Sequence, residues 1–179
     1  MSKPVKIPFL FLLTVFLFAS CDKEVTGITY VTHLKATTDE ITVNDTQNNN
    51  SNLFDIEFDV NLENEDTREY LDQIKNFELE KISLFFHGLD SLAENQTPTH
   101  LKITIDNDIV FDYSDFKYSM IANGNPFVIN DTEKLNEVAE LLYNNKFIHV
   151  KIEGEIPDTQ YYQFFIEIDV LAKMEVDAL

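Results

Sequence analysis

Alternating hydrophobic and polar positions are the dominant pattern of this chain. From Phe54 to Leu62 every second side chain is apolar, and the residues between them are acidic or Asn. Period two over nine residues predicts a strand with one buried face. Other alternating runs predict further strands at 28–34, 77–86, 101–106, 109–113, 116–120, 148–152 and 162–174. The alternation slips at Glu80-Lys81, which predicts a β-bulge.

Helical spacing occurs in two places. Over residues 131–144 the apolar side chains recur at i, i+3, i+4 and i+7, which predicts an amphipathic helix. Asn130 or Asp131 can cap its first turn. A weaker pattern predicts a short helix within 66–75. The polar residues 44–52 predict a surface loop inside the domain.

Seven or eight short strands and one clear helix predict a mainly β domain. We expect a single antiparallel β-sandwich of the immunoglobulin-like or Greek-key type, or a partly open barrel. An α+β arrangement is the alternative, because the helix at 131–144 would then cover one face of a sheet.

The first 21 residues have a different character. Lys3 and Lys6 precede an uncharged apolar run over 7–18, which is followed by the small residues Ala19-Ser20 and the only cysteine, Cys21. Basic, apolar and small residues in that order are typical of a secretory signal peptide. The apolar run is shorter than the about 20 residues that a membrane-spanning helix needs.

Phe18-Ala19-Ser20-Cys21 resembles a bacterial lipoprotein lipobox, although Phe18 stands where such lipoboxes have Leu or a small aliphatic residue. The resemblance implies that Cys21 receives a diacylglyceryl group, that the chain is cut before it, and that fatty acids such as palmitate anchor it. Asp22-Lys23-Glu24 resembles the surface-export tags of Bacteroidota lipoproteins. The implied location is the bacterial cell envelope, lipid-anchored in the outer membrane and exposed at the cell surface.

These features divide the chain into a signal peptide (1–20), a lipidated tether (21–25) and a β-rich extracytoplasmic domain (26–179). An ordinary signal peptide with an incidental cysteine, or an uncleaved anchor, are the alternatives. The mature chain would have 159 residues (179 minus 20), the size of one domain. Its net charge would be −21, because the signal peptide takes two lysines from a chain of −19. Such an acidic chain excludes nucleic acid as a partner.

No constellation of catalytic residues is recognisable. The four histidines do not stand at metal-ligand spacing, and no second cysteine accompanies Cys21. With four glycines, the chain has neither a nucleophile elbow nor a phosphate-binding loop. We therefore expect no catalytic residues and no cofactor. The abundant carboxylates keep a glycan-active hydrolase open as an alternative.

Asp106, Asp108 and Asp112 are candidate calcium ligands around the hairpin turn predicted at 107–108. The chain lacks an EF-hand pattern, and Asp or Asn at such a place is first of all a turn former. We therefore expect no dedicated metal site, with these three residues as the candidates if one exists.

The phase of the predicted strands turns three aromatic side chains outward, namely Phe85, Tyr161 and Phe165. Exposed aromatic rings on a sheet are typical contacts for a protein or glycan partner. The sequence thus favours a lipid-anchored, non-enzymatic binding or assembly module with an unknown protein or glycan partner. A carrier of a small apolar ligand is a further alternative, because phenylalanines are frequent on the inward faces.

Overall fold

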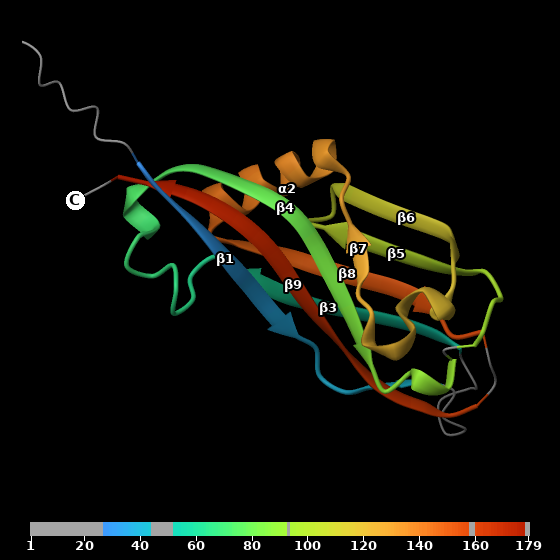
Figure 1. Cartoon of the computed structure of the whole chain (residues 1–179). Helices are drawn as coiled ribbons and strands as arrows, with labels where there is room; N and C mark the ends of the chain where they lie inside the picture. The colour runs from blue at the N-terminus through green and yellow to red at the C-terminus, as the bar shows by residue number, and fades with distance from the viewer. Residues whose placement is uncertain (1–26, 44–51, 93, 158–159, 178–179) are drawn as a thin grey trace, which may run out of the picture.

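The protein is a sandwich of two antiparallel sheets (Figure 1). This computed structural model describes residues 27–43, 52–92, 94–157 and 160–177, so the predicted signal peptide and Cys21 lie outside the described residues. One sheet contains β1 (Ile28–Thr37), β2 (Ile41–Val43), β4 (Ile74–His87), β7 (Phe127–Ile129) and β9 (Tyr162–Val176). The other contains β3 (Leu53–Asn61), β5 (Thr99–Ile105), β6 (Ile109–Phe116) and β8 (Phe147–Glu155).

The order of the strands defines the type of sandwich. The first sheet runs β1-β9-β4-β7, with β2 also paired to β9, and the second runs β3-β8-β5-β6. Numbered without the three-residue β2, the eight strands have the orders 1-8-3-6 and 2-7-4-5. This interleaving of two Greek keys is the jelly roll. The predicted antiparallel sandwich is therefore confirmed, in its Greek-key form.

The interior is filled by the inward side chains of both sheets and by helix α2 (Thr132–Asn145). Phe116 lies at the centre of a group of rings, with centroids 6.0 Å from Phe86, 5.2 Å from Tyr118 and 5.3 Å from Phe127. The ring of Phe54 meets that of Phe164 edge to face at 5.3 Å. The interior aromatic rings thus pack against one another, as in a close-packed core.

Helix α2 is the predicted amphipathic helix, and its bounds agree with the prediction within one residue. The Asp131 side chain accepts a hydrogen bond from the Lys134 amide, which caps the first turn. The helix ends at Lys146, which has a left-handed φ of 68° and donates its amide to the Leu142 carbonyl. Its buried face contacts β4 of one sheet and β8 of the other. In the described part of the chain, no helix is long and apolar enough to cross a membrane.

Two predictions of secondary structure were wrong. In place of a helix over 66–75, the chain forms turns and a short 3-10 helix, η1 (Leu71–Gln73). The Asn64 side chain accepts hydrogen bonds from the amides of Asp66 and Thr67, and this local bonding competes with a helix. In place of a strand over 116–120, β6 ends at Phe116 and the 3-10 segment η3 (Tyr118–Gly124) follows. There the Tyr118 hydroxyl turns inward and donates to the Glu155 carbonyl at 3.1 Å.

The predicted bulge is confirmed. Leu79 pairs with Ala172 but Lys81 pairs with Leu171, so Glu80 is the extra residue. The predicted hairpin is confirmed too, with β5 and β6 joined by a tight turn. Asp106 and Asn107 both have positive φ at this turn, 49° and 66°. Asp and Asn tolerate that conformation better than other residues with a Cβ.

Strands β1 and β6 each lie at an edge of their sheet, and one side chain binds the backbone of each. The Asn64 side-chain amide donates to the His33 carbonyl of β1 at 3.3 Å. From helix α2, the Lys134 ammonium donates to the Val110 carbonyl of β6 at 2.6 Å. The same ammonium lies 5.1 Å from the centre of the Phe111 ring.

Candidate binding face

The outer face of the five-stranded sheet carries a row of aromatic rings. The outward positions of β9 and β4 place Phe165 opposite His87, while Phe85 is opposite Glu167. The His87 ring stacks on Phe165 at 4.6 Å and on Phe85 at 6.4 Å, with angles of 20° and 17° between the planes. Phe165 is 39% exposed and Phe85 is half-buried. Both predicted outward aromatics are therefore brought together, and His87 joins them.

Tyr161, the third predicted contact residue, lies just before β9 and is 54% exposed. Among the described residues it makes no ring contact with Phe85 or Phe165. The structure places it on the surface, as expected, but outside the row.

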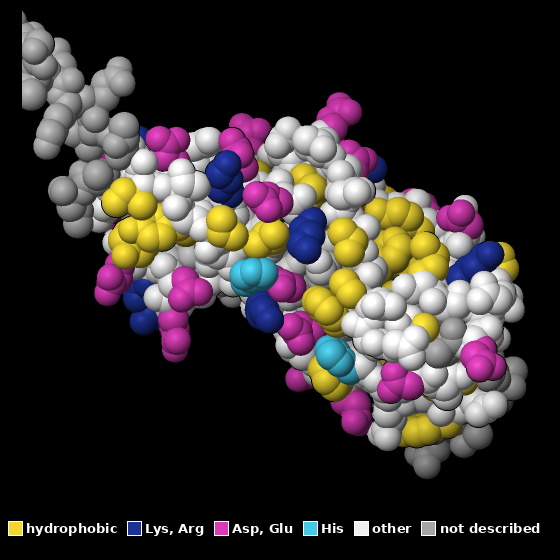
Figure 2. Space-filling view, in the orientation of Figure 1, with side chains coloured by type: hydrophobic (Ala, Val, Ile, Leu, Met, Phe, Trp, Pro, Cys, Tyr) yellow, Lys and Arg dark blue, Asp and Glu magenta, His cyan; other side chains and the backbone are white. Residues whose placement is uncertain are grey.

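Apolar side chains continue from the ring row along the same face. Leu171, in the middle of β9, is half-buried and lies opposite His33 and Lys81. Val31 of β1 is 62% exposed and Val128 of β7 is 42% exposed. Figure 2 shows apolar side chains across this face with charged side chains between them. We call the set the outer strip, which consists of Val31, Phe85, His87, Val128, Phe165 and Leu171.

Some of the charges around the outer strip are paired with each other. His33 Nδ1 lies 2.8 Å from Asp169 Oδ1, and Lys35 Nζ lies 3.4 Å from Glu167 Oε1. His87 Nε2 is buried without a hydrogen-bond partner and lies 3.5 Å from Glu167 Oε2. These ion pairs lie between the apolar side chains of the face, while Lys81 and Lys173, also on its described strands, form no ion pair.

The outer strip also lies on the less acidic face of the sandwich. The outward positions of β1, β4 and β9, including the bulge residue, carry five acids, three lysines and two histidines. On the opposite face, β3 and β8 alone carry five acids against one lysine and one histidine. In a chain of net charge −19, most of the negative charge thus lies away from the outer strip.

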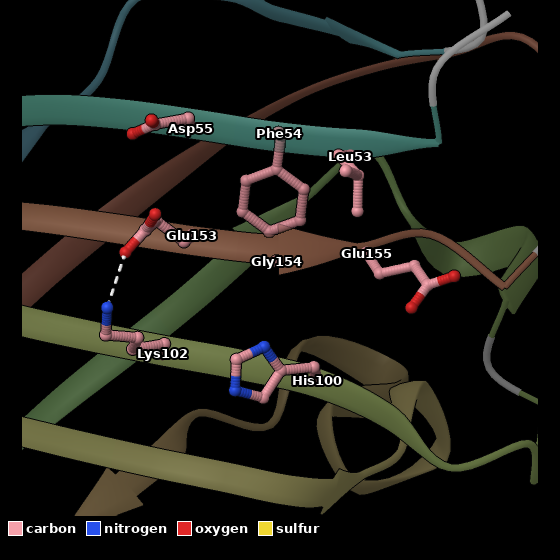
Figure 3. Close-up of a pocket in the computed structure, with 8 residues that line it drawn as sticks. All are labelled: Leu53, Phe54, Asp55, His100, Lys102, Glu153, Gly154 and Glu155. Carbon is pink, nitrogen blue, oxygen red and sulfur yellow. Dashed lines mark hydrogen bonds and ion pairs between the residues drawn. The ribbon is translucent and has the colours of Figure 1, made fainter.

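The other face holds a shallow cavity of about 360 Å³ (Figure 3). It brings Asp55, Glu153 and Glu155 near His100 and Lys102, which is the kind of cluster a hydrolase would use. The hydrogen bond from Lys102 to Glu153, 3.1 Å long, lowers the pKa of that carboxyl. A glycosidase general acid needs a raised pKa. Neither Tyr161 nor Phe165 lines this cavity.

The structure does not bring the three candidate calcium ligands together. Asp106 Oδ1 accepts the His149 amide at 2.8 Å, so this carboxylate binds β8. Asp112 Oδ1 lies 2.8 Å from His100 Nε2. Within the described ranges, no group of three or more His, Cys, Asp or Glu side chains is placed to hold a metal ion. The carboxylates of Asp106 and Asp112 thus have structural partners in the protein itself.

Sequence reasoning missed that every histidine has a carboxylate partner. Each imidazole lies near an acid on the neighbouring strand. The closest contacts are His33–Asp169, His87–Glu167, His100–Asp112 and His149–Asp59. His100 and Asp112 are 12 residues apart, across the predicted hairpin. No local pattern could have shown the other three pairs, because each depends on the pairing of strands that are far apart in the sequence.

The His149–Asp59 pair predicts that stability depends on pH. The hydrogen bond with Asp59, 3.0 Å long, raises the pKa of His149 above its ordinary value of 6.5. A raised pKa in the folded state stabilises the fold below about pH 6.5, and this contribution is lost as the pH rises through the folded-state value. Because the pair is exposed, we expect His149→Gln to remove only about 0.2–0.5 kcal/mol of stability at pH 6 and almost none at pH 8.5.

Urea unfolding at the two pH values measures this difference. Asp59→Asn is the matched control, because it removes the partner and leaves the imidazole, and it should flatten the same pH dependence. An equal effect of His149→Gln at both pH values would contradict the role of this pair.

Comparisons with known proteins identify no family for this chain. No family model matches it, and no curated protein matches it. The decameric BFDV capsid protein superposes with a TM-score of 0.45 at 7% identity, over 82% of this chain and 99% of that one. Its 60-mer form gives 0.46 at 9% identity, over 86% and 97%. A structure of Desmodium yellow mottle tymovirus gives 0.37 at 10% identity, over 100% and 94%. Likeness at this level says nothing about function.

Proposed function

We propose that this protein is a lipid-anchored envelope lipoprotein of the Bacteroidota type, whose jelly-roll domain is a non-enzymatic binding or assembly module. Cys21 holds the domain at the outer membrane, facing the cell exterior. The observation that carries the proposal of a binding module is the outer strip, which exposes aromatic and apolar side chains on one sheet face.

The interior favours a binding module over a carrier. A carrier of an apolar ligand needs unfilled space between the sheets, lined by apolar side chains. Here Phe116 is in contact with three other aromatic rings, and Phe54 packs on Phe164. These phenylalanines are the residues that suggested a carrier, and they are used in packing.

The electrostatics of the cavity on the other face disfavour a hydrolase. Lys151 lies 3.0 Å from Asp55 and 3.4 Å from Glu153, while Lys102 also holds Glu153. The hydrogen bond from Lys102 and the ion pair with Lys151 lower the pKa of Glu153, so this carboxyl does not supply the proton that a leaving group needs. The same arrangement is a common way to stabilise neighbouring strands.

The charge of the domain makes a lipid anchor necessary for membrane attachment. A mature chain of −21 (−19 minus two lysine charges) is repelled by an anionic membrane surface. Buried acyl chains stabilise attachment by about 0.8 kcal/mol per methylene, and two or more chains hold a protein stably. The lipobox-like residues before Cys21 supply the site for them.

Cys21→Ala is expected to abolish labelling of the protein by a radioactive or clickable fatty acid and to move it entirely from the membrane to the soluble fraction. The reason is that Cys21 carries the only thiol of the chain. Ser20→Ala is the matched control, because it keeps a small residue before the cysteine and should label as the wild type does.

Labelling that persists in Cys21→Ala would contradict the anchor. In the same experiment, protease added to intact cells distinguishes the two sides of the outer membrane. Digestion of the domain supports exposure at the cell surface, and full protection would place the domain on the periplasmic side.

A further inference from the structure

Strand β3 is an edge of the four-stranded sheet, on the side away from β6 (Figure 1). It has nine residues and pairs with β8 without a register shift. Edge strands are commonly protected by a proline, a bulge or a very short length. β3 has none of these, so its backbone is regular enough to pair with a further strand.

The hydrogen bonds at the two ends of β3 show which of its backbone groups face β8. Antiparallel strands alternate between residue pairs that exchange hydrogen bonds and pairs that do not. The Ile156 amide donates to the Asn52 carbonyl, and the Leu62 amide donates to the Lys146 carbonyl, each at 2.8 Å. Both pairs continue the register of β3 with β8, so the even-numbered residues of β3 exchange bonds with β8. The backbone groups of its odd-numbered residues therefore point to the open edge.

Asp55, Glu57 and Asp59 are the central odd-numbered residues of β3. Among the described residues, no hydrogen bond reaches the backbone N–H or C=O group of these three. Alternate residues of a strand repeat these groups about every 6.8 Å, and a second extended backbone repeats its own at the same spacing. Main-chain hydrogen bonds of this kind give strand addition its affinity. The geometry of this edge thus fits an extended peptide segment.

The side chains of the same three residues favour a basic segment. All three carboxylates lie on the outer face, and the side chains of Asp55, Glu57 and Asp59 are 57%, 56% and 55% exposed. β3 contains no basic residue. On β8, Lys151 lies 3.0 Å from Asp55, and His149 lies 3.0 Å from Asp59 and 3.6 Å from Glu57. Further positive charges on an added strand would lie beside these acids, and opposite charges stabilise cross-strand pairs.

The inner face of the edge favours apolar residues between the basic ones. Ile56 and Phe58 pack against the core but are only half-buried. Their partners on the central strand β8, Ile152 and Val150, are fully buried. Apolar side chains on an added strand would cover Ile56 and Phe58. Because side chains alternate between the two faces of a strand, the fitting segment alternates basic and apolar residues.

The described strands of a second copy do not supply such a segment. Two β3 strands paired antiparallel about Glu57 would bring Glu57 opposite Glu57 and Asp55 opposite Asp59, and like charges at such positions are destabilising. Among the other described edges, β1 and β6 each have a carbonyl bound by a side chain, and β2 and β7 have three residues each. Charge and strand length therefore favour a different protein.

We propose that the edge of β3 binds an extended segment of another protein, in which lysine or arginine alternates with apolar residues, and adds it to the four-stranded sheet as a further strand. This contact is separate from the outer strip, and it depends neither on the outer strip nor on the lipid anchor. The net charge of −19 also attracts a basic partner over longer distances.

A designed peptide tests the proposal on the full-length protein purified in detergent. The probe is a fluorescent nine-residue peptide that alternates lysine and valine, which matches the length of β3. Its binding is measured by fluorescence anisotropy at about 0.15 M salt, where distant charges are screened. We expect the peptide to bind and to slow hydrogen exchange of the Asp55, Glu57 and Asp59 amides. A peptide with the same composition but all lysines in one block should bind at least tenfold more weakly.

Methylation of the peptide backbone separates strand addition from attraction by charge. In the proposed register the lysines lie opposite Asp55, Glu57 and Asp59, so the lysine amides point toward β3 and the valine amides point away from it. Methylating the lysine amides should weaken binding at least about tenfold, because several hydrogen bonds are lost. Methylating the valine amides is the matched control and should leave binding almost unchanged.

Glu57→Lys should weaken binding of the alternating peptide about tenfold, because it replaces an attraction between paired side chains by a repulsion. Glu137→Lys, on the exposed face of α2, makes the same change in net charge and should have less than a twofold effect. Circular dichroism checks that both variants keep the fold. The proposal is overturned if the alternating peptide does not bind, if both methylated peptides bind equally, or if both variants lose the same affinity.

Discussion

Replacing Phe116 by Ala is expected to lower the free energy of unfolding by about 3–5 kcal/mol, as for other large buried aromatics. Phe116 is 2% exposed and its ring contacts those of Phe86, Tyr118 and Phe127. Its removal leaves a cavity that these neighbours cannot fill without leaving their own packing positions. Urea or thermal unfolding followed by circular dichroism measures the change.

Phe165→Ala is the matched control, because it is the same substitution at a surface position. We expect it to cost no more than about 0.5–1 kcal/mol, because Phe165 is 39% exposed and its removal leaves a gap at the surface that water can fill. A cost below about 1 kcal/mol for Phe116→Ala would show an interior that is already loosely packed. That outcome would favour the carrier over the binding module.

Gly154→Ala is the second substitution with a large expected effect, about 1–3 kcal/mol of destabilisation from overpacking. Gly154 lies in β8 opposite Phe54 of β3 and Leu101 of β5. A Cβ at this position would lie 2.6 Å from Cε1 and 3.1 Å from Cε2 of the Phe54 ring. Figure 3 shows this ring lying against the glycine. The strand or the ring must therefore move to accommodate one methyl group.

A double-mutant cycle with Phe54→Leu tests this cause. The smaller side chain should make room for the methyl group, so the double variant should be more stable than the sum of the two single effects predicts. Additive effects would show that the glycine is needed for another reason, such as the conformation of its backbone.

Side-chain periodicity correctly predicted those strands and the helix that have one buried face and one exposed face. The alternation over Phe54–Leu62 and over β9 arises because one face is buried and the other is not. The helix at 132–145 could be predicted for the same reason, since its apolar stripe covers the core. Strands β2 and β7, with three residues each, are too short to show a period.

Pairing between distant strands could not be predicted in this way. The outward position of Phe85 was predictable because the pattern itself slips at Glu80. Phe85 and Phe165 both stack on the His87 ring. This contact depends on the register of β4 with β9, which no local sequence pattern contains. The weaker acidity of this face could not be predicted either. Its charged side chains come from β1, β4 and β9, and only the pairing of these strands brings them onto one face.

The side chains that bind two of the edge strands have a consequence for aggregation. An edge strand with free backbone groups can add a strand from a neighbour, and repetition of this step leads to fibres. Asn64 binds the His33 carbonyl of β1 and Lys134 binds the Val110 carbonyl of β6, so neither of these two edge strands offers an uninterrupted ladder. The two side chains thus hinder the addition of a further strand at one edge of each sheet, and with it the growth of fibres from those edges.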